Sequence, residues 1–460
     1  MEMSKQRNLP VAIIGGGPVG LAAAAHLVQK GESFILFEAG KSVGSNILEW
    51  GHVKMFSPWQ YNIDKASREL LEKSGWLSPN DTTLPTGQEL VEDYLYPLSR
   101  LNELKAHIKL NANVVGIARK GLDKLKGLKR DEVPFEVYVD IDGDTKIFDA
   151  KAIIDSSGTW KNPNPSLSNG IWTNAERSLK NQIYYGIPEV KNIRERYKNK
   201  NVMVIGSGHS AINALLELAK LKEQYPNTVI YWAMRKQNVK EAYGGQENDS
   251  LEARGELGIR IQKLVDSEQI KVIPSFYINN LQKENGKITV KGYQRTKETL
   301  IHDIDELVVS TGFRPDVSFL NEIRVNLDPA VESVEALAPL IDPNLHSCGT
   351  VRPHGEKELR QPEKNFYIVG MKSYGRAPTF LLATGYEQVR SIVAYLTGDL
   401  KGAEEVHLEL PETGVCRTNI VSDCCSTETT IIQLESESCC TPKITPFNIE
   451  IIKKDSTCCS

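Results

Sequence analysis

Apolar and polar positions near the start of the chain predict a strand, a tight turn, a helix and a second strand. Val11–Ile14 is a run of four apolar residues, which is typical of a buried parallel strand. An alanine-rich, helix-forming run follows at 21–28, and the apolar stretch after it ends in Glu38. The turn between the first strand and the helix reads G-G-G-P-V-G, in which three residues match G-x-G-x-x-G: Gly15, Gly17 and Gly20.

Each glycine of this turn has a physical task. The first permits the tight turn, the second lets the backbone approach a pyrophosphate, and the third lets helix and strand pack closely. The phosphates then meet the free N–H groups and the positive dipole end of the helix. Glu38 stands about twenty residues on, where an acid accepts a hydrogen bond from a ribose hydroxyl. This pattern predicts a dinucleotide site; the alternative is a glycine-rich turn that holds no ligand.

The same pattern returns in the middle of the chain. A strand is expected at Asn201–Ile205, a helix at 212–221 and a second strand at 228–232. The turn between them, G-S-G-H-S-A, carries Ala211 in place of the third glycine. Here the second strand leads to Arg235 and Lys236 rather than to an acid. A guanidinium can hold a 2′-phosphate bidentately, so the turn predicts NADPH rather than NADH, unless both cations are merely solvated.

The remaining pattern indicates two copies of one architecture. Single strands are expected at 108–118 and 135–147, and two further strands run into S-S-G at 156–158 and T-G-F at 311–313. The fold class is therefore α/β with two Rossmann-like dinucleotide-binding domains. The first domain is expected to comprise 1–162 and 316–405, the second 163–315, and a mobile tail 406–460.

Composition narrows the function. The 460 residues carry a net charge of −4, which favours neither nucleic acid nor an anionic membrane. No apolar run is long enough to span a bilayer and no signal peptide is evident, so we expect a cytoplasmic protein.

Cysteine is distributed unevenly: there are eight, and none precedes Cys348. Adjacent thiols bind soft, thiophilic ions, and the lack of C-x-x-C spacing speaks against structural zinc. We expect capture of a soft metal or metalloid, with a mobile thiol relay and an incidental tail as alternatives. The candidate ligands are three adjacent pairs in the tail: Cys424, Cys425, Cys439, Cys440, Cys458 and Cys459.

The two glycine motifs, Glu38 and the S-T-G-F-R-P segment resemble the two-dinucleotide-binding flavoproteins, most closely the flavin-containing monooxygenases, over roughly 10–400. The resemblance implies FAD in the first domain and NADPH in the second. Asn62, Tyr374 and Arg376 are further polar candidates for contact with the flavin, with an ordinary structural role as the alternative. For FAD the implied contacts are Gly15, Gly17, Pro18, Gly20 and Glu38, backbone around Val114 and Gly158, and a loop carrying Trp50 and Ser57; for NADPH they are Gly206, Ser207, Gly208, His209, Ser210 and Arg235.

The chain departs from that family before the second motif, where Y-Y-G-I-P-E-V at 184–190 keeps only the aromatic residue and the glycine. It looks more like the arsenic-operon branch of flavoprotein monooxygenases. The resemblance implies that oxygen adds to reduced flavin as a C4a-hydroperoxide and is transferred to a soft nucleophile such as a trivalent arsenical, a sulfide or an amine. No catalytic side chain is identified. The alternatives are a reductase resembling thioredoxin or mercuric reductase that uses the C-terminal thiols, and a metalloid-binding protein.

Overall fold

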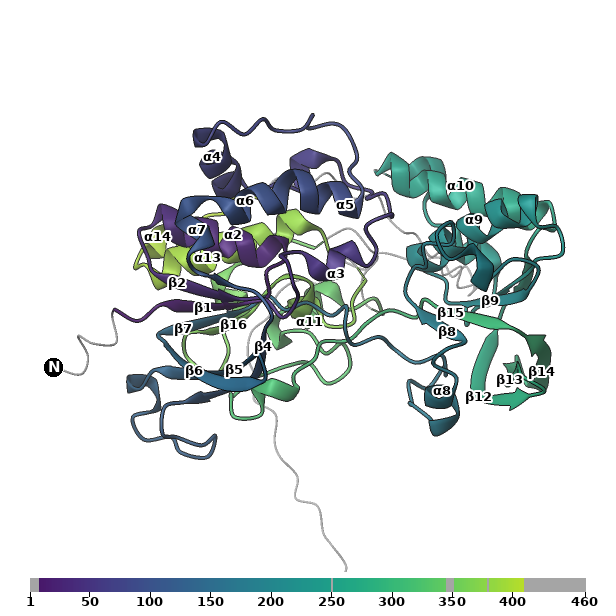
Figure 1. Ribbon diagram of the computed structural model, residues 1–460. Coiled ribbons are helices and arrows are strands. Elements are labelled where there is room, and N and C mark those ends of the chain that lie inside the picture. The colour runs from purple at the N-terminus through teal and green to yellow at the C-terminus, as the bar shows by residue number, and fades with distance from the viewer. Residues whose placement is uncertain (1–7, 250, 345–350, 379, 409–460) are drawn as a thin grey trace, which may run out of the picture. The chain divides into compact units, whose positions relative to one another are not determined.

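The computed structural model describes residues 8–249, 251–344, 351–378 and 380–408. The first nucleotide-type sheet has the strand order β16-β7-β1-β2-β3, with every pair parallel (Figure 1). Its strands are β1 (Val11–Ile14), β2 (Phe34–Phe37), β3 (Ile108–Lys109), β7 (Ala152–Asp155) and β16 (Phe366–Ile368). Because the strands are parallel, their carboxyl ends share one edge, which is where ligands bind in such sheets.

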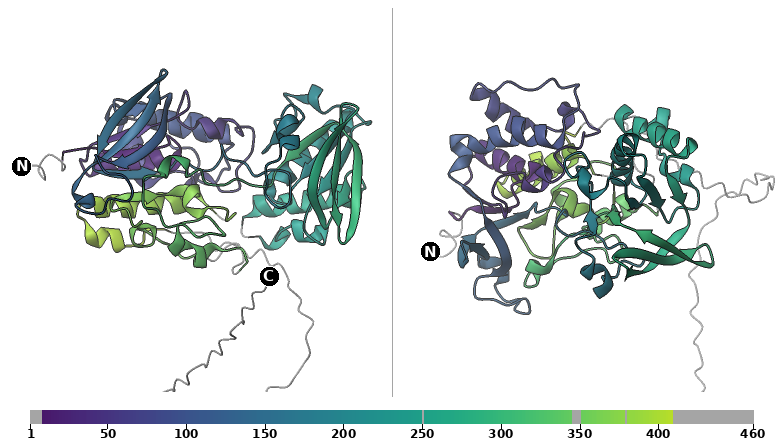
Figure 2. Two further views of the ribbon diagram at one scale, coloured as in Figure 1. Left: turned by 90° about the horizontal axis from the view of Figure 1, so that it is seen from below. Right: turned by 45° about the vertical axis from the view of Figure 1, so that its right-hand side comes forward.

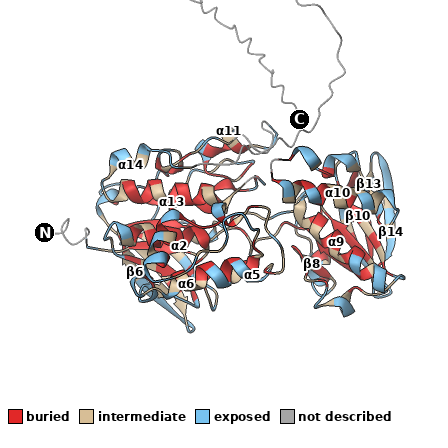
Figure 3. Ribbon diagram, turned by 90° about the horizontal axis from the view of Figure 1, so that it is seen from above, coloured by how far each residue is buried: buried red, intermediate tan, exposed pale blue. Residues whose placement is uncertain are grey.

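Two layers cover this sheet. Helices α2 (Pro18–Gln29) and α13 (Leu382–Leu396) lie on one face, and both are largely buried (Figure 3). The other face is covered by a three-stranded antiparallel sheet of β4 (Ala112–Arg119), β5 (Phe135–Ile141) and β6 (Asp144–Ala150) (Figure 1). One continuous hydrophobic cluster includes residues of all three layers.

The second sheet has the order β11-β10-β9-β15-β8 and is also parallel throughout. Helices α9 (His209–Gln224) and α10 (Glu252–Asp266) lie on one face of this sheet, and a three-stranded antiparallel sheet lies on the other (Figure 2). Each of these layers contributes to a hydrophobic cluster with the parallel sheet. The strands are β8 (Ile183–Tyr185), β9 (Asn201–Ile205), β10 (Val229–Ala233), β11 (Lys271–Ile273) and β15 (Glu306–Val309), with β12 (Phe276–Glu284), β13 (Lys287–Gln294) and β14 (Lys297–Ile304) in the smaller sheet.

The two sheets repeat one plan. In each, the strand before the glycine turn is central, and the antiparallel sheet is inserted before the strand that ends in the serine-glycine or threonine-glycine segment. The sheets differ in the outermost strand, which is β16 from late in the chain in the first and β8 from early in the unit in the second. The α/β class and the internal repeat are therefore confirmed, whereas the domain boundaries stay a prediction.

Shorter helices lie outside these layers or at their ends. A capping box opens α5 (Gly87–Glu89): the Glu89 N–H donates to Thr86 Oγ1 at 3.1 Å, and the Thr86 N–H donates to Glu89 Oε2 at 2.7 Å. The short helices are α3 (Ser45–Leu48), α4 (Lys65–Lys73), α5 (Gly87–Glu89), α6 (Tyr96–Arg100), α7 (Asn102–Lys105), α8 (Asn174–Ser178), α11 (Ala338–Ile341), α12 (Glu356–Leu359) and α14 (Leu400–Glu404).

The two predicted single strands are each two strands. The stretch expected as one strand at 135–147 is the hairpin of β5 and β6, turning at Asp142 and Gly143 with φ of 54° and 89°. An aspartate-glycine pair with positive φ at both positions is the usual two-residue hairpin turn, so the signal was present in the sequence. Likewise 108–118 divides into β3 and β4, which belong to different sheets.

None of the described helices combines the length and apolar character needed to cross a bilayer. Cys348 and all seven tail cysteines lie outside the described residues, so the predicted capture site is not described structurally.

A buried ion cluster joins β4 to the segment that precedes β16. Arg119 Nε donates to Glu363 Oε1 at 2.7 Å, and Arg130 Nε donates to Glu363 Oε2 at 2.9 Å. All three side chains are at most 3% exposed, and the Arg119 guanidinium also lies 3.7 Å from the centre of the Phe135 ring. Removing the shared carboxylate therefore leaves two buried cations without their counter-ion.

We expect Glu363→Gln to lower the free energy of unfolding by about 3–5 kcal/mol, because breaking a buried pair strands its partners. Urea denaturation followed by circular dichroism measures the change. Glu298→Gln is the matched control, since Glu298 pairs with Lys291 at the surface and its loss should leave the urea midpoint nearly unchanged. Equal losses in the two variants would contradict the role given to the cluster.

Candidate dinucleotide-binding sites

The first glycine turn leaves no room for side chains at two of its positions. Gly15 has φ of +98°, and a Cβ there would lie 2.8 Å from the Ser156 carbonyl oxygen. A Cβ on Gly20 would lie 2.0 Å from the Gly15 carbonyl oxygen. The glycines are therefore required by the approach of β1, α2 and the segment after β7, as the spacing predicts.

Gly17 is different, because its environment is open. It has φ of −83°, which any residue adopts, and no described atom lies within 4 Å of the Cβ that it lacks. Gly17 is also the N-cap of α2, and no side chain caps that helix. The start of α2 thus presents uncapped backbone amides and the positive end of the helix dipole beside free space, which fits a pyrophosphate.

Glu38 is held at this edge by the backbone. Its Oε2 accepts from the Gly16 N–H and its Oε1 from the Gly40 N–H, each at 2.7 Å. A carboxylate has about four acceptor positions, so these two bonds orient Glu38 without exhausting it. The remaining lone pairs suit a ribose diol.

The second glycine turn has the same geometry. Gly206 has φ of +130°, and a Cβ there would lie 2.3 Å from the Ser310 carbonyl oxygen. Gly208 is the N-cap of α9 with φ of −89°, again with no side-chain cap and no described atom near its missing Cβ. The Trp232 indole donates to the Gly206 carbonyl oxygen at 2.7 Å and so fixes the turn to β10.

His209 begins α9, and burial lowers its pKa to about 4, with the nearby Arg254 guanidinium as the next cause. His209 is therefore neutral at physiological pH, and the helix N-terminus also disfavours its protonation. Arg235 is exposed and makes no ion pair among the described residues, whereas Lys236 donates to the Glu241 carbonyl oxygen. Arg235 is thus available to a phosphate. Ser207 and Ser210 are partly buried in the same turn and helix start.

The loop residues expected near the flavin make local contacts. Ser57 is buried and its Oγ donates to Asn62 Oδ1 at 2.8 Å, while Asn62 Nδ2 donates back to the Ser57 carbonyl oxygen at 2.6 Å. The Trp50 ring packs against Gly87, where a Cβ would approach it to 2.8 Å. Both Ser57 and Asn62 thus have local partners, and a contact of any of the three with FAD stays a prediction.

Other expected positions lie at the ends or irregularities of strands. Val114 is at a shift of register between β4 and β5, and Gly158, with φ of +72°, follows β7. Tyr374 is buried and stands edge-on to Phe380, whereas Arg376 is exposed. Their approach to a cofactor likewise stays a prediction.

The sequence pattern does not predict one buried charged pair at the carboxyl edge of the first sheet. Lys372 Nζ donates to Asp155 Oδ2 at 2.7 Å, and both side chains are fully buried. An aspartate ending an otherwise apolar strand was the available signal. Its partner was not identifiable, because the two residues are 217 positions apart.

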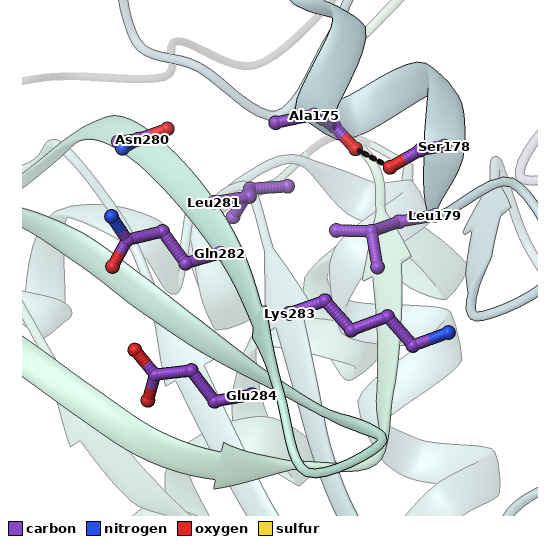
Figure 4. Close-up of a pocket in the computed structure, with 8 residues that line it drawn as sticks. All are labelled: Ala175, Ser178, Leu179, Asn280, Leu281, Gln282, Lys283 and Glu284. Carbon is purple, nitrogen blue, oxygen red and sulfur yellow. Dashed lines mark hydrogen bonds between the residues drawn. The ribbon is translucent and has the colours of Figure 1, made fainter.

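A separate surface depression of about 470 Å³ lies between α8 and β12 (Figure 4). None of its lining residues belongs to either glycine turn: Ala175, Ser178, Leu179, Asn280, Leu281, Gln282, Lys283 and Glu284. It therefore adds nothing to the dinucleotide sites.

The two open glycines allow a matched pair of substitutions. Gly17→Ala and Gly208→Ala add a methyl group where no protein atom interferes, so both variants should fold. We expect Gly17→Ala to weaken FAD binding about tenfold or more and Gly208→Ala to do the same for NADPH, since the methyl group meets the pyrophosphate. Flavin fluorescence and NADPH titration measure the two affinities. A variant that keeps its own nucleotide and loses the other would refute the assignment.

The low pKa of His209 predicts acid sensitivity. An unfolded histidine titrates near 6.5, so between about pH 6.5 and 4 the unfolded chain binds the extra proton. The contribution of neutral His209 to the free energy of unfolding is therefore complete above pH 6.5 and is lost as the pH falls toward 4. We expect His209→Gln to flatten this part of the stability profile, measured by urea unfolding at pH 7.5 and 5. A variant as acid-sensitive as the wild type would show that other groups cause the loss.

Comparison with known proteins places the chain in a family. The model of the pyridine nucleotide-disulphide oxidoreductases matches residues 12–335. A ferredoxin–NADP reductase of Lactobacillus johnsonii is 24% identical over 343 residues, covering 74% of this chain and 85% of the relative.

Solved structures with the same fold include reductases and monooxygenases. The bacillithiol disulfide reductase of Bacillus cereus superposes with a TM-score of 0.61 at 20% identity, over 85% of this chain and 99% of that one. The ornithine N-hydroxylase of Kutzneria sp. 744 gives 0.59 at 16% identity, over 86% and 100%. Members of the matched family bind FAD and NADP(H), so the predicted cofactors are confirmed. The chain belongs to the pyridine nucleotide-disulphide oxidoreductase family and is a flavin-dependent oxidoreductase that uses a pyridine nucleotide.

Proposed function

We propose that this protein is an NADPH-dependent flavoprotein monooxygenase of soft nucleophiles. The observation that carries the proposal is the absence of cysteine before Cys348. Reduction of a disulfide by flavin needs a dithiol beside the ring, and the two nucleotide units together contain one cysteine, Cys348, which cannot form a dithiol alone. Electrons then leave through a diffusible acceptor, and dioxygen is the natural one.

In this proposal each glycine turn holds one nucleotide. Gly15, Gly17, Pro18, Gly20 and Glu38 bind FAD, with further contacts at Trp50, Ser57, Val114 and Gly158. The second turn binds NADPH through Gly206–Ser210, and Arg235 holds the 2′-phosphate. FAD supplies the redox chemistry when bound. The protein binds and orients the two nucleotides, and its buried residues around them exclude water.

The balance of the reaction is that of an external monooxygenase. One NADPH and one proton reduce one dioxygen; one oxygen atom enters the substrate and the other leaves as water. A trivalent arsenical, a sulfide or an amine offers the lone pair that accepts the oxygen atom. The resemblance to the arsenic-operon branch and the tail cysteines favour the arsenical, which the thiols would capture in the cytoplasm.

A disulfide reductase is the second candidate. The matched family includes disulphide oxidoreductases, and the tail of this chain carries three adjacent cysteine pairs. In that case the tail thiols accept the electrons, and no oxygen is consumed.

The test is NADPH consumption in air with arsenite, methylarsenite, an amine and a thioether, each offered alone. We expect one substrate to raise the rate at least tenfold, with oxygenated product equal to NADPH consumed and little hydrogen peroxide. A chain ending at Val406 is the matched control, because it keeps both glycine turns and removes the seven tail cysteines. NADPH oxidation that persists under nitrogen, exposes new thiols and disappears on truncation would replace the proposal with the reductase.

A further inference from the structure

A fully buried ion pair lies directly behind the first glycine turn. Asp155 is the last residue of β7 and is paired in register with Ile14, the residue before Gly15. Parallel strands lie about 4.8 Å apart, so the Asp155 backbone neighbours the turn. Ser156, the next residue, donates its hydroxyl to the Ile14 carbonyl oxygen at 2.8 Å.

Lys372, in the segment that follows β16, neutralises Asp155. Its ammonium donates to Asp155 Oδ2 at 2.7 Å and to Ser157 Oγ at 3.0 Å, and lies 4.4 Å from the centre of the Phe319 ring. Lys372 thus makes two hydrogen bonds and one cation–π contact within the protein. Asp155 Oδ1 accepts from the Ser157 hydroxyl at 2.7 Å.

The pair joins two segments that border the turn. Lys372 belongs to the 3₁₀ turn Gly370–Tyr374, and the Gly370 position faces Val19 of α2, whose Cγ2 would lie 3.3 Å from a Cβ. Asp155 and Ser157 lead into Gly158, where the chain leaves the first sheet. The bridge therefore fixes both segments beside the uncapped start of α2.

Stability alone does not explain a buried ion pair. Desolvation of two charges costs several kcal/mol per ion, and apolar side chains of similar volume often stabilise a core as well or better. An anionic ligand on the glycine turn supplies a reason for the lysine, since an unpaired Asp155 carboxylate behind the turn would repel it.

We propose that Lys372 is a positioning residue for FAD, which cancels the charge of Asp155 behind the glycine turn and holds the 370–374 turn against the crossover at Ser157. The inference rests on the proposed placement of FAD on the first turn. Because Lys372 and Asp155 carry opposite charges, removing one or the other should shift the midpoint potential of the bound flavin in opposite directions.

The experiment compares Lys372→Met, Asp155→Asn and the double variant. Flavin fluorescence gives the FAD dissociation constant, and equilibration with a reference dye gives the midpoint potential. Reduction adds negative charge to the flavin. We therefore expect Lys372→Met to weaken FAD binding at least tenfold and lower the potential, and Asp155→Asn to raise the potential. The double variant should return both values close to those of the wild type.

Lys120→Met is the matched control, because Lys120 pairs with Asp149 at the surface. Shifts of the same sign in both single variants, or additive losses in the double variant, would overturn the inference. Should Lys372→Met fail to bind FAD, recovery of binding in the double variant supports the inference and continued loss overturns it. The placement of FAD is tested separately by Gly17→Ala: FAD retained in that variant refutes the placement, whatever the lysine variants show.

Discussion

The two candidate dinucleotide sites depend on the uncapped backbone amides at the start of α2 and α9. A helix begins with N–H groups that have no partner within the helix, and each glycine turn directs them to the carboxyl edge of a parallel sheet. The turns can do so only without side chains, because the Ser156 and Ser310 carbonyl oxygens lie where a Cβ of Gly15 or Gly206 would be. The same edge is open at Gly17 and Gly208.

The two nucleotide units share one fold, so they differ chiefly in the residues that follow the second strand of each unit. Glu38 follows β2 and is oriented by the amides of Gly16 and Gly40, an arrangement that suits neutral hydroxyl groups. Arg235 follows β10 and is exposed, an arrangement that suits a phosphate. The two frames therefore differ in charge at one corresponding place, and the proposed assignment of the two nucleotides rests on this difference.

Buried ion pairs connect distant parts of the chain around the first sheet. The bond from Arg119 to Glu363 spans 244 positions, and the bond from Lys372 to Asp155 spans 217. Both connect residues before the second nucleotide unit with residues after it. The segment after the second nucleotide unit supplies β16 to the first sheet and α13 to the layer that covers it. These ion pairs therefore connect the two parts of the chain that build the first sheet and its covering layers.

The sequence by itself determined what depends on neighbouring residues. Both strand-turn-helix units and the α/β class follow from local spacing, because glycines and apolar runs act over a few positions. The hairpin turn at Asp142–Gly143 has an equally local signal, the aspartate-glycine pair itself. Only the tertiary structure decided that Arg119 meets Glu363 and that Lys372 meets Asp155. Such contacts depend on how distant segments pack, and no pattern of spacing along the chain encodes them.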